Sequence, residues 1–222
     1  MKVSDEVSKM TSILKNSKYR NLFLYYFFPG VAVGFYATFI YKLIGLSIIQ
    51  GEHESDDDYN KKVNFRSGMV FIALGFSQAL TGFIMNRVGE RFCKFKEAIF
   101  GTLMVEIAGF VSLLCYFLKS YPLCFAVAFL WGSSETFLQT NIGALTGLIF
   151  PGKVEAFSVY RVIFALGTTV TIVLNVLLRN QPAWVFLTIV MTLQVFISIV
   201  SIQLRDLQKK SPESESLIDE AS

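Results

Sequence analysis

Six long runs of mostly apolar residues constrain this chain more than any other feature. Each run has about 20 residues or more, which at ~1.5 Å of helical rise per residue crosses the ~30 Å hydrocarbon core of a bilayer. A β-barrel instead needs alternating segments of about ten residues, and these runs do not alternate. The sequence therefore predicts an all-α membrane protein with six transmembrane helices, at Asn21–Ile49, Ser67–Met85, Ala98–Leu118, Leu123–Phe150, Ala156–Leu178 and Ala183–Leu204.

The composition agrees with this fold class. Apolar residues make up 53% of the 222 residues and charged residues only 17%, whereas soluble domains have about 25% charged residues. We divide the chain into a polar N-terminal tail (1–20), a transmembrane domain (21–204) and a polar, disordered C-terminal tail (205–222). No signal peptide precedes the first run, so we expect the first helix to direct insertion.

The distribution of basic residues predicts the orientation, because Lys and Arg collect in short cytosolic loops. Five of the basic residues outside the spans fall on the side that carries the acidic run "GEHESDDDYN". Thirteen fall on the side of the two termini, which we therefore place in the cytosol of a plasma or endo-lysosomal membrane: Lys2, Lys9, Lys15, Lys18, Arg20, Arg87, Arg91, Lys94, Lys96, Lys153, Arg205, Lys209 and Lys210.

The end of the second run, "TGFIMNRVGERFCKFK", has a distinctive spacing of glycine, amide and arginine. It resembles the loop motif between the second and third helices of each half of the major facilitator superfamily. A plain basic cytosolic loop is the other interpretation. The residues that match the motif are Gly82, Asn86, Arg87, Gly89 and Arg91.

Polar side chains inside the fourth run are the main candidates for function. Glu135 and Gln139 are one helical turn apart and share a face, and Asn141 follows them. A central charge costs roughly 3 kcal/mol on insertion scales, so an intramembrane acid is suspected of a functional role. Either Glu135 holds helices together as a buried acid, or it binds a ligand or proton.

Two further intramembrane charges, Glu106 and Arg161, lie at similar predicted depths near the cytosolic ends of their runs. We expect either an ion pair between them or an Arg161 side chain that reaches the lipid phosphates. Gly30-x-x-x-Gly34 in the first run and Gly143-x-x-x-Gly147 in the fourth permit close helix packing. The first and fourth helices are therefore predicted to be a closely packed pair that lines an interior face.

The fourth and fifth runs carry a second and more specific resemblance. "GSSETFLQTNIGALTGLIF" and "EAFSVYRVIFALG" resemble the fourth and fifth helices in the C-terminal half of the uncoordinated-93 family. That family has the twelve-helix major facilitator architecture, so the resemblance implies one six-helix half of such a fold. The matching residues are Gly132, Glu135, Gln139, Thr140, Ala144, Leu145, Gly147, Phe150, Glu155, Ala156, Phe157, Tyr160, Arg161, Leu166 and Gly167.

The resemblance implies a non-catalytic protein, because members of that family regulate potassium channels or escort membrane receptors. The alternatives are a half-size transporter in which Glu135 couples solute to ions, and a structural subunit of a membrane assembly. The expected partners are the lipid bilayer and either a channel, a receptor or a second six-helix half, with a homodimer included. Glu213, Leu217 and Ile218 in the C-terminal tail match an acidic di-leucine sorting motif, a short pattern that often arises by chance.

Enzymatic chemistry has little support in the sequence. The only histidine is His53, and there is no nucleophile–base set and no phosphate-binding loop. Cys93, Cys115 and Cys124 have no paired spacing, so they predict neither a disulfide framework nor a metal site. We expect no cofactor, and no nucleic-acid partner because the basic residues follow the membrane edge.

Overall fold

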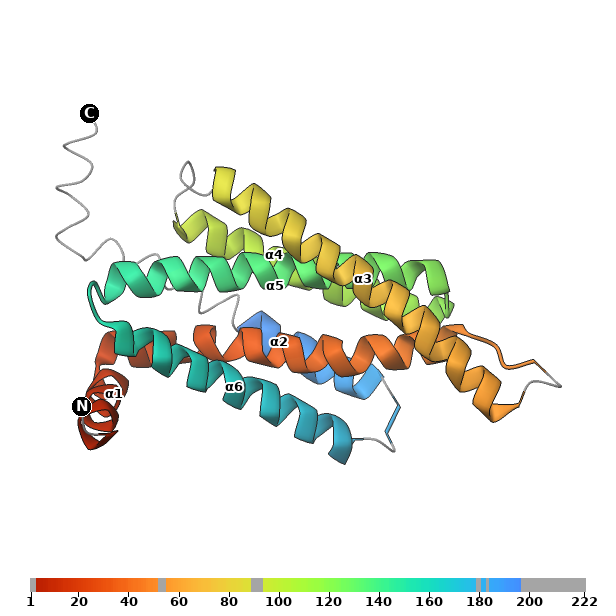
Figure 1. The fold of residues 1–222 in the computed structure, drawn as a ribbon, viewed down its shortest axis with the longest axis horizontal. Helices are drawn as coiled ribbons and strands as arrows, with labels where there is room; N and C mark the ends of the chain where they lie inside the picture. Colours follow the sequence, from red (N-terminus) through yellow and green to blue (C-terminus); the bar gives the residue numbers. More distant parts are fainter. Residues whose placement is uncertain (1–2, 52–54, 89–93, 179–180, 183, 197–222) are drawn as a thin grey trace.

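The computed structural model describes residues 3–51, 55–88, 94–178, 181–182 and 184–196. Every regular element in these residues is an α-helix (Figure 1). The helices are α1 (Val3–Lys15), α2 (Ser17–Ser47), α3 (Asp56–Val88), α4 (Lys94–Leu118), α5 (Tyr121–Ile149), α6 (Val154–Leu177) and a shorter helix at Trp184–Phe196.

Helices α2 and α5 organise the bundle. Helix α2 packs mainly against α6 and also contacts α5, while α5 packs between α3 and α4. The Trp184–Phe196 helix contacts α2 through the Phe186 ring, whose centroid is 5.4 Å from that of Phe35. It also reaches α4, where Gln194 Nε2 donates to the Thr102 carbonyl at 3.4 Å. The end of α3, the start of α4 and the turn between α5 and α6 lie at one end of the bundle, together with α1 (Figure 1).

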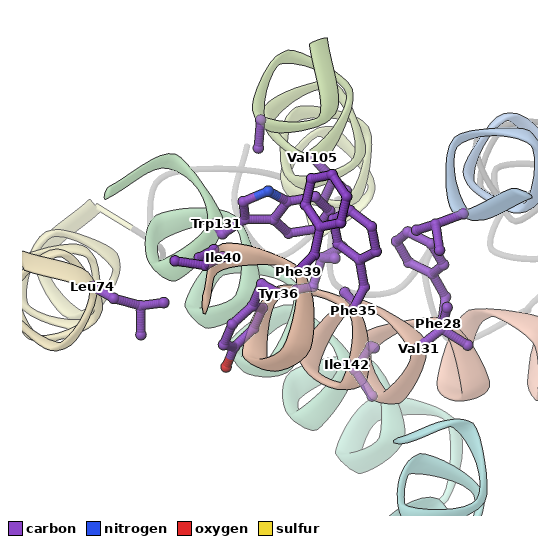
Figure 2. Packing of buried hydrophobic residues seen from close by; sticks show 14 of the residues in the cluster. Phe28, Val31, Phe35, Tyr36, Phe39, Ile40, Leu74, Val105, Trp131 and Ile142 are labelled. Atoms are coloured by element: carbon purple, nitrogen blue, oxygen red, sulfur yellow. The ribbon is translucent and has the colours of Figure 1, made fainter. Parts of the chain in front are cut away.

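Aromatic rings fill the space between α2, α4 and α5. Phe35 and Phe39 stack on successive turns of α2 with ring centroids 4.7 Å apart, and Trp131 of α5 lies 5.1 Å from Phe35 (Figure 2). The Trp131 indole Nε1 donates to the hydroxyl of Ser112 on α4 at 2.9 Å. These rings are almost completely buried. The polar atom among them, the indole nitrogen, has a hydrogen-bond partner, as a buried tryptophan requires.

The outer surface of the bundle is also apolar, as contact with lipid requires. Large apolar side chains are exposed at helical spacing along α3, at Phe65, Met69, Ile72, Phe76 and Phe83. Four helices are long and apolar enough to cross a membrane: Leu22–Ser47, Asp56–Arg87, Phe100–Leu118 and Val154–Leu177. The chain thus has the character of a helical, multi-pass membrane protein, and these four helices agree with four of the six predicted spans.

The other two predicted spans have a different status. Helix α5 lies where Leu123–Phe150 was predicted, but it is not among the helices apolar enough to span. Its polar residues, such as Ser134 and Asn141, are buried among α2, α3 and α4, so they meet protein rather than lipid. Of the predicted span Ala183–Leu204, the described residues contain only the helix Trp184–Phe196.

Two helical segments were not predicted. The N-terminal tail contains α1, which buries Ile13 and pairs Lys9 Nζ with Glu155 Oε1 of α6 at 3.4 Å. Helix α3 begins inside the acidic run, with Asp56, Asp57 and Asp58 in its first turn, where negative charge is favourable. Ser55 caps this end, since its hydroxyl accepts from the Asp58 amide at 3.2 Å.

Candidate functional site

The buried carboxylate of Glu135 joins three helices. Both of its oxygens accept hydrogen bonds: Oε1 from Gln139 Nε2 at 2.7 Å, and Oε2 from Gln78 Nε2 at 2.7 Å and from the Tyr36 hydroxyl. Tyr36 belongs to α2, Gln78 to α3, and Gln139 to α5 itself. We call these four residues the Glu135 cluster.

The geometry explains how an acid can occupy an apolar segment. Only 8% of Glu135 is exposed, so its carboxylate receives little help from water. Three donors replace that water, and hydrogen bonds to an ionised group are stronger than those between neutral groups. In Figure 2 the Tyr36 hydroxyl points away from Trp131, while the Tyr36 ring centroid lies 6.3 Å from that of Trp131, so the cluster borders the aromatic packing. The arrangement is suited to tying α2, α3 and α5 together.

Asn141 and Thr146 extend the polar contact between α2 and α5. The Tyr25 hydroxyl donates to Asn141 Oδ1 at 2.9 Å, and the Thr146 hydroxyl donates to the oxygen of Tyr26 at 3.1 Å. All four side chains are buried. Together with Tyr36 and Glu135 they form what we call the tyrosine interface, in which three tyrosines of α2 each meet a polar group of α5.

The first and fourth predicted helices, α2 and α5, form the expected polar contact, but the prediction that their glycines pack against each other is wrong. Gly30 and Gly34 of α2 face α6 instead: a Cβ atom on Gly30 would overlap the Phe164 carbonyl, and one on Gly34 would lie 2.8 Å from the Thr168 carbonyl. A Cβ atom on Gly167 of α6 would lie 2.4 Å from the Phe27 carbonyl. We call Gly30, Gly34 and Gly167 the glycine interface.

Gly143 and Gly147 of α5 take no part in a close helix contact. A Cβ atom on Gly143 would meet nothing within 4 Å, and one on Gly147 would meet only the Phe157 ring, at 3.8 Å. The spacing of small residues therefore identified a close-packing helix in one case of two. It could not identify the neighbour, because any helix can fill the space that a glycine leaves.

The structure does not bring Glu106 and Arg161 together. No ion pair joins them among the described residues, and α4 and α6 are not principal neighbours. Arg161 is exposed, with its guanidinium 5.5 Å from the ring centroid of Tyr160, while Glu106 is half-buried on α4. The alternative interpretation, in which the Arg161 side chain reaches the lipid phosphates, stays a prediction.

The loop motif is described only in part. Gly82, Asn86 and Arg87 lie in the last turns of α3, and the Arg87 guanidinium is 5.0 Å from the ring centroid of Phe83. Gly89 and Arg91 fall outside the described residues, as do the sorting-motif residues Glu213, Leu217 and Ile218. Among the described residues, no group of three or more His, Cys, Asp or Glu side chains could hold a metal ion.

Two members of the Glu135 cluster, Tyr36 and Gln78, were missed by the sequence reasoning. Gln78 stands in the apolar run "GFSQALTG", so the criterion that identified Gln139 would also have identified it. A buried tyrosine needs a partner for its hydroxyl group, which makes the tyrosines of α2 candidates as well. Their partners could not be predicted, because pairing depends on which helices are neighbours.

Comparison of this chain with protein families, curated proteins and solved structures gave no match.

Proposed function

We propose that this chain is a non-catalytic, multi-pass membrane protein that regulates or escorts a potassium channel or a membrane receptor. The proposal includes the resemblance to the uncoordinated-93 family, both termini in the cytosol, and a location in the plasma or endo-lysosomal membrane. It also includes six membrane-crossing helices as one half of a major facilitator fold, with α5 and the helix that begins at Trp184 counted as the fourth and the sixth.

The observation that supports this proposal most is the hydrogen bonding of Glu135. A carboxylate that couples transport has to exchange protons or ions with a path through the membrane. Glu135 instead accepts bonds from Tyr36, Gln78 and Gln139, and such exchange would disturb this network. A tie of this kind favours a stable scaffold over a moving carrier. The apolar surface of α3 is available to lipid or to the membrane-embedded face of a partner.

Affinity purification of the full chain in a mild detergent, followed by mass spectrometry, tests this function. We expect a channel or receptor to co-purify at a fixed stoichiometry, and its surface level to fall when the chain is removed. The half-size transporter predicts a self-dimer alone, together with pH- or ion-dependent solute uptake that Glu135→Gln abolishes. A matched control is Tyr41→Phe, which removes a hydroxyl group that donates to Asn64 on the exposed surface.

A structural subunit of a larger assembly remains the third possibility, and the same purification separates it from an escort. A structural subunit stays bound to its assembly at the final destination. An escort releases its partner at the destination. Less partner should therefore co-purify with the chain when the purification starts from surface membranes. A self-dimer without any channel or receptor would contradict the proposal.

A further inference from the structure

Cys115 and Cys124 lie side by side although nothing in their sequence spacing predicts it. Cys115 is three residues before the end of α4 at Leu118, and Cys124 is three residues after the start of α5 at Tyr121. Their sulfur atoms are 3.6 Å apart, and both side chains are completely buried. Each thiol also faces the Ser120 carbonyl, at 3.6 Å from Cys115 and 3.7 Å from Cys124.

The turn between the two helices fixes this arrangement. Lys119 adopts a left-handed conformation with φ of 48° and donates its amide to the Cys115 carbonyl at 2.9 Å. The Leu123 amide donates to the Ser120 carbonyl at 3.1 Å. Because both ends of the turn are hydrogen-bonded, the thiols face each other across a short hairpin. A disulfide needs the sulfurs about 1.6 Å closer.

We propose that Cys115 and Cys124 form an intramolecular disulfide that locks the α4–α5 hairpin. The distribution of basic residues places this end of the bundle on the extracytosolic side, where disulfides form and persist. The oxidant is a disulfide of the thiol–disulfide exchange type, such as an oxidoreductase or glutathione disulfide. The reaction takes place during membrane insertion, before packing against α2 covers the pair.

The exchange proceeds in two balanced steps. One thiolate attacks a sulfur of the oxidant, which gives a mixed disulfide and releases one thiol of the oxidant. The second cysteine then attacks the sulfur of the first, forms the Cys115–Cys124 bond and releases the other thiol. Two protons and two electrons pass from the cysteines to the oxidant, and no other group is consumed.

Counting free thiols in the full chain tests this inference. Membranes are quenched in acid, denatured, labelled with N-ethylmaleimide and analysed by intact mass, with and without a prior reductant. We expect one label per chain without reductant, on Cys93, and three after reduction. Cys93→Ser provides the matched control, because it removes exchange with the third cysteine; it should give no label before reduction and two after it.

Two labels on Cys93→Ser chains without reductant would overturn the inference, because both thiols would then be free in the membrane. A second variant guards against a disulfide between chains. Cys124→Ser should give equal label counts with and without reductant and a monomer on a non-reducing gel. A covalent dimer of Cys93→Ser chains, lost on reduction, would equally contradict an intramolecular bond. The disulfide rests on the orientation proposed above but not on the channel or receptor partner, so thiol counting and the partner purification can fail separately.

Discussion

Helix α2 meets α6 and α5 in opposite ways. Against α6 it offers the glycine interface, where backbones approach so closely that a Cβ atom on Gly30 would overlap the Phe164 carbonyl. Against α5 it offers the tyrosine interface, where side chains bridge the helices through hydrogen bonds such as the one from Tyr25 to Asn141. The glycine interface depends on close backbone packing, so it tolerates almost no added side-chain volume. The tyrosine interface depends on hydrogen bonds, so it tolerates substitutions that change side-chain shape but keep the donors and acceptors.

The comparison shows how one helix can be fixed in a medium that gives little hydrophobic driving force between helices. Association in lipid depends on close packing and on interhelical hydrogen bonds, and α2 uses one on each side. The two interfaces should therefore respond differently to the same size of substitution, and the following changes test that difference.

The largest effect is expected at the glycine interface. Gly30→Ala introduces a methyl group where the Phe164 carbonyl and the Thr168 amide already lie, and overpacking of this kind costs about 3 kcal/mol. Thermal unfolding of the purified protein in detergent measures the loss. Gly143→Ala is the matched control, because its Cβ atom would meet nothing within 4 Å. Equal stability of the two variants would mean that α2 and α6 are not in close contact.

Removal of the carboxylate is expected to have the next largest effect. Glu135→Leu leaves the Tyr36 hydroxyl and the amides of Gln78 and Gln139 without their acceptor. Unpaired buried donors are costly, although the loss of a buried charge offsets part of that cost, so we expect about 2 kcal/mol of destabilisation. Glu135→Gln keeps an acceptor oxygen and should lose about half as much. Denaturant or thermal unfolding measures both losses. If the Glu135→Gln variant were less stable than the Glu135→Leu variant, the hydrogen-bonded arrangement would be contradicted.

A single interhelical hydrogen bond should matter less. Tyr25→Phe keeps the ring but removes its bond to Asn141, and such bonds in membrane bundles contribute about 1 kcal/mol. The control is Tyr41→Phe, whose bond to Asn64 is exposed and should contribute little. The midpoint of thermal unfolding should fall for the first variant and stay unchanged for the second. A larger fall in the unfolding midpoint for Tyr41→Phe than for Tyr25→Phe would contradict this ranking, because it would mean that the Tyr41 hydroxyl is not exposed.

The smallest change, of opposite sign, is expected at Gly75 on α3, and the same argument applies to the control Gly143→Ala. Nothing lies within 4 Å of a Cβ atom there, and alanine is a better helix former than glycine. Gly75→Ala should therefore raise stability slightly, by about 0.5 kcal/mol. A loss of stability in the purified chain would show that this face packs against protein.

The sequence predicted the helical, membrane-embedded character of the chain because apolar run length follows directly from bilayer thickness. It also identified Glu135, Gln139 and Asn141, since polar groups in such runs need partners. It failed on contacts: the neighbour of Gly30, the partners of Glu135 and the adjacency of Cys115 and Cys124 all depend on how the helices are arranged. Run length carries no information about that arrangement. The helix α1 was missed because the prediction relied on long apolar runs, whereas its apolar residues Val7, Met10 and Ile13 have the three-residue spacing of an amphipathic helix.

The central claim is that polar side chains in the apolar segment bind helices to one another, and a double-mutant cycle between Tyr36 and Glu135 tests it most directly. Tyr36→Phe, Glu135→Leu and the double variant are compared by unfolding in the same detergent. We expect the double variant to be more stable than the sum of the single losses predicts, with a coupling energy of about 1 kcal/mol or more. Strictly additive losses would contradict the claim, because they would show that the two side chains do not interact.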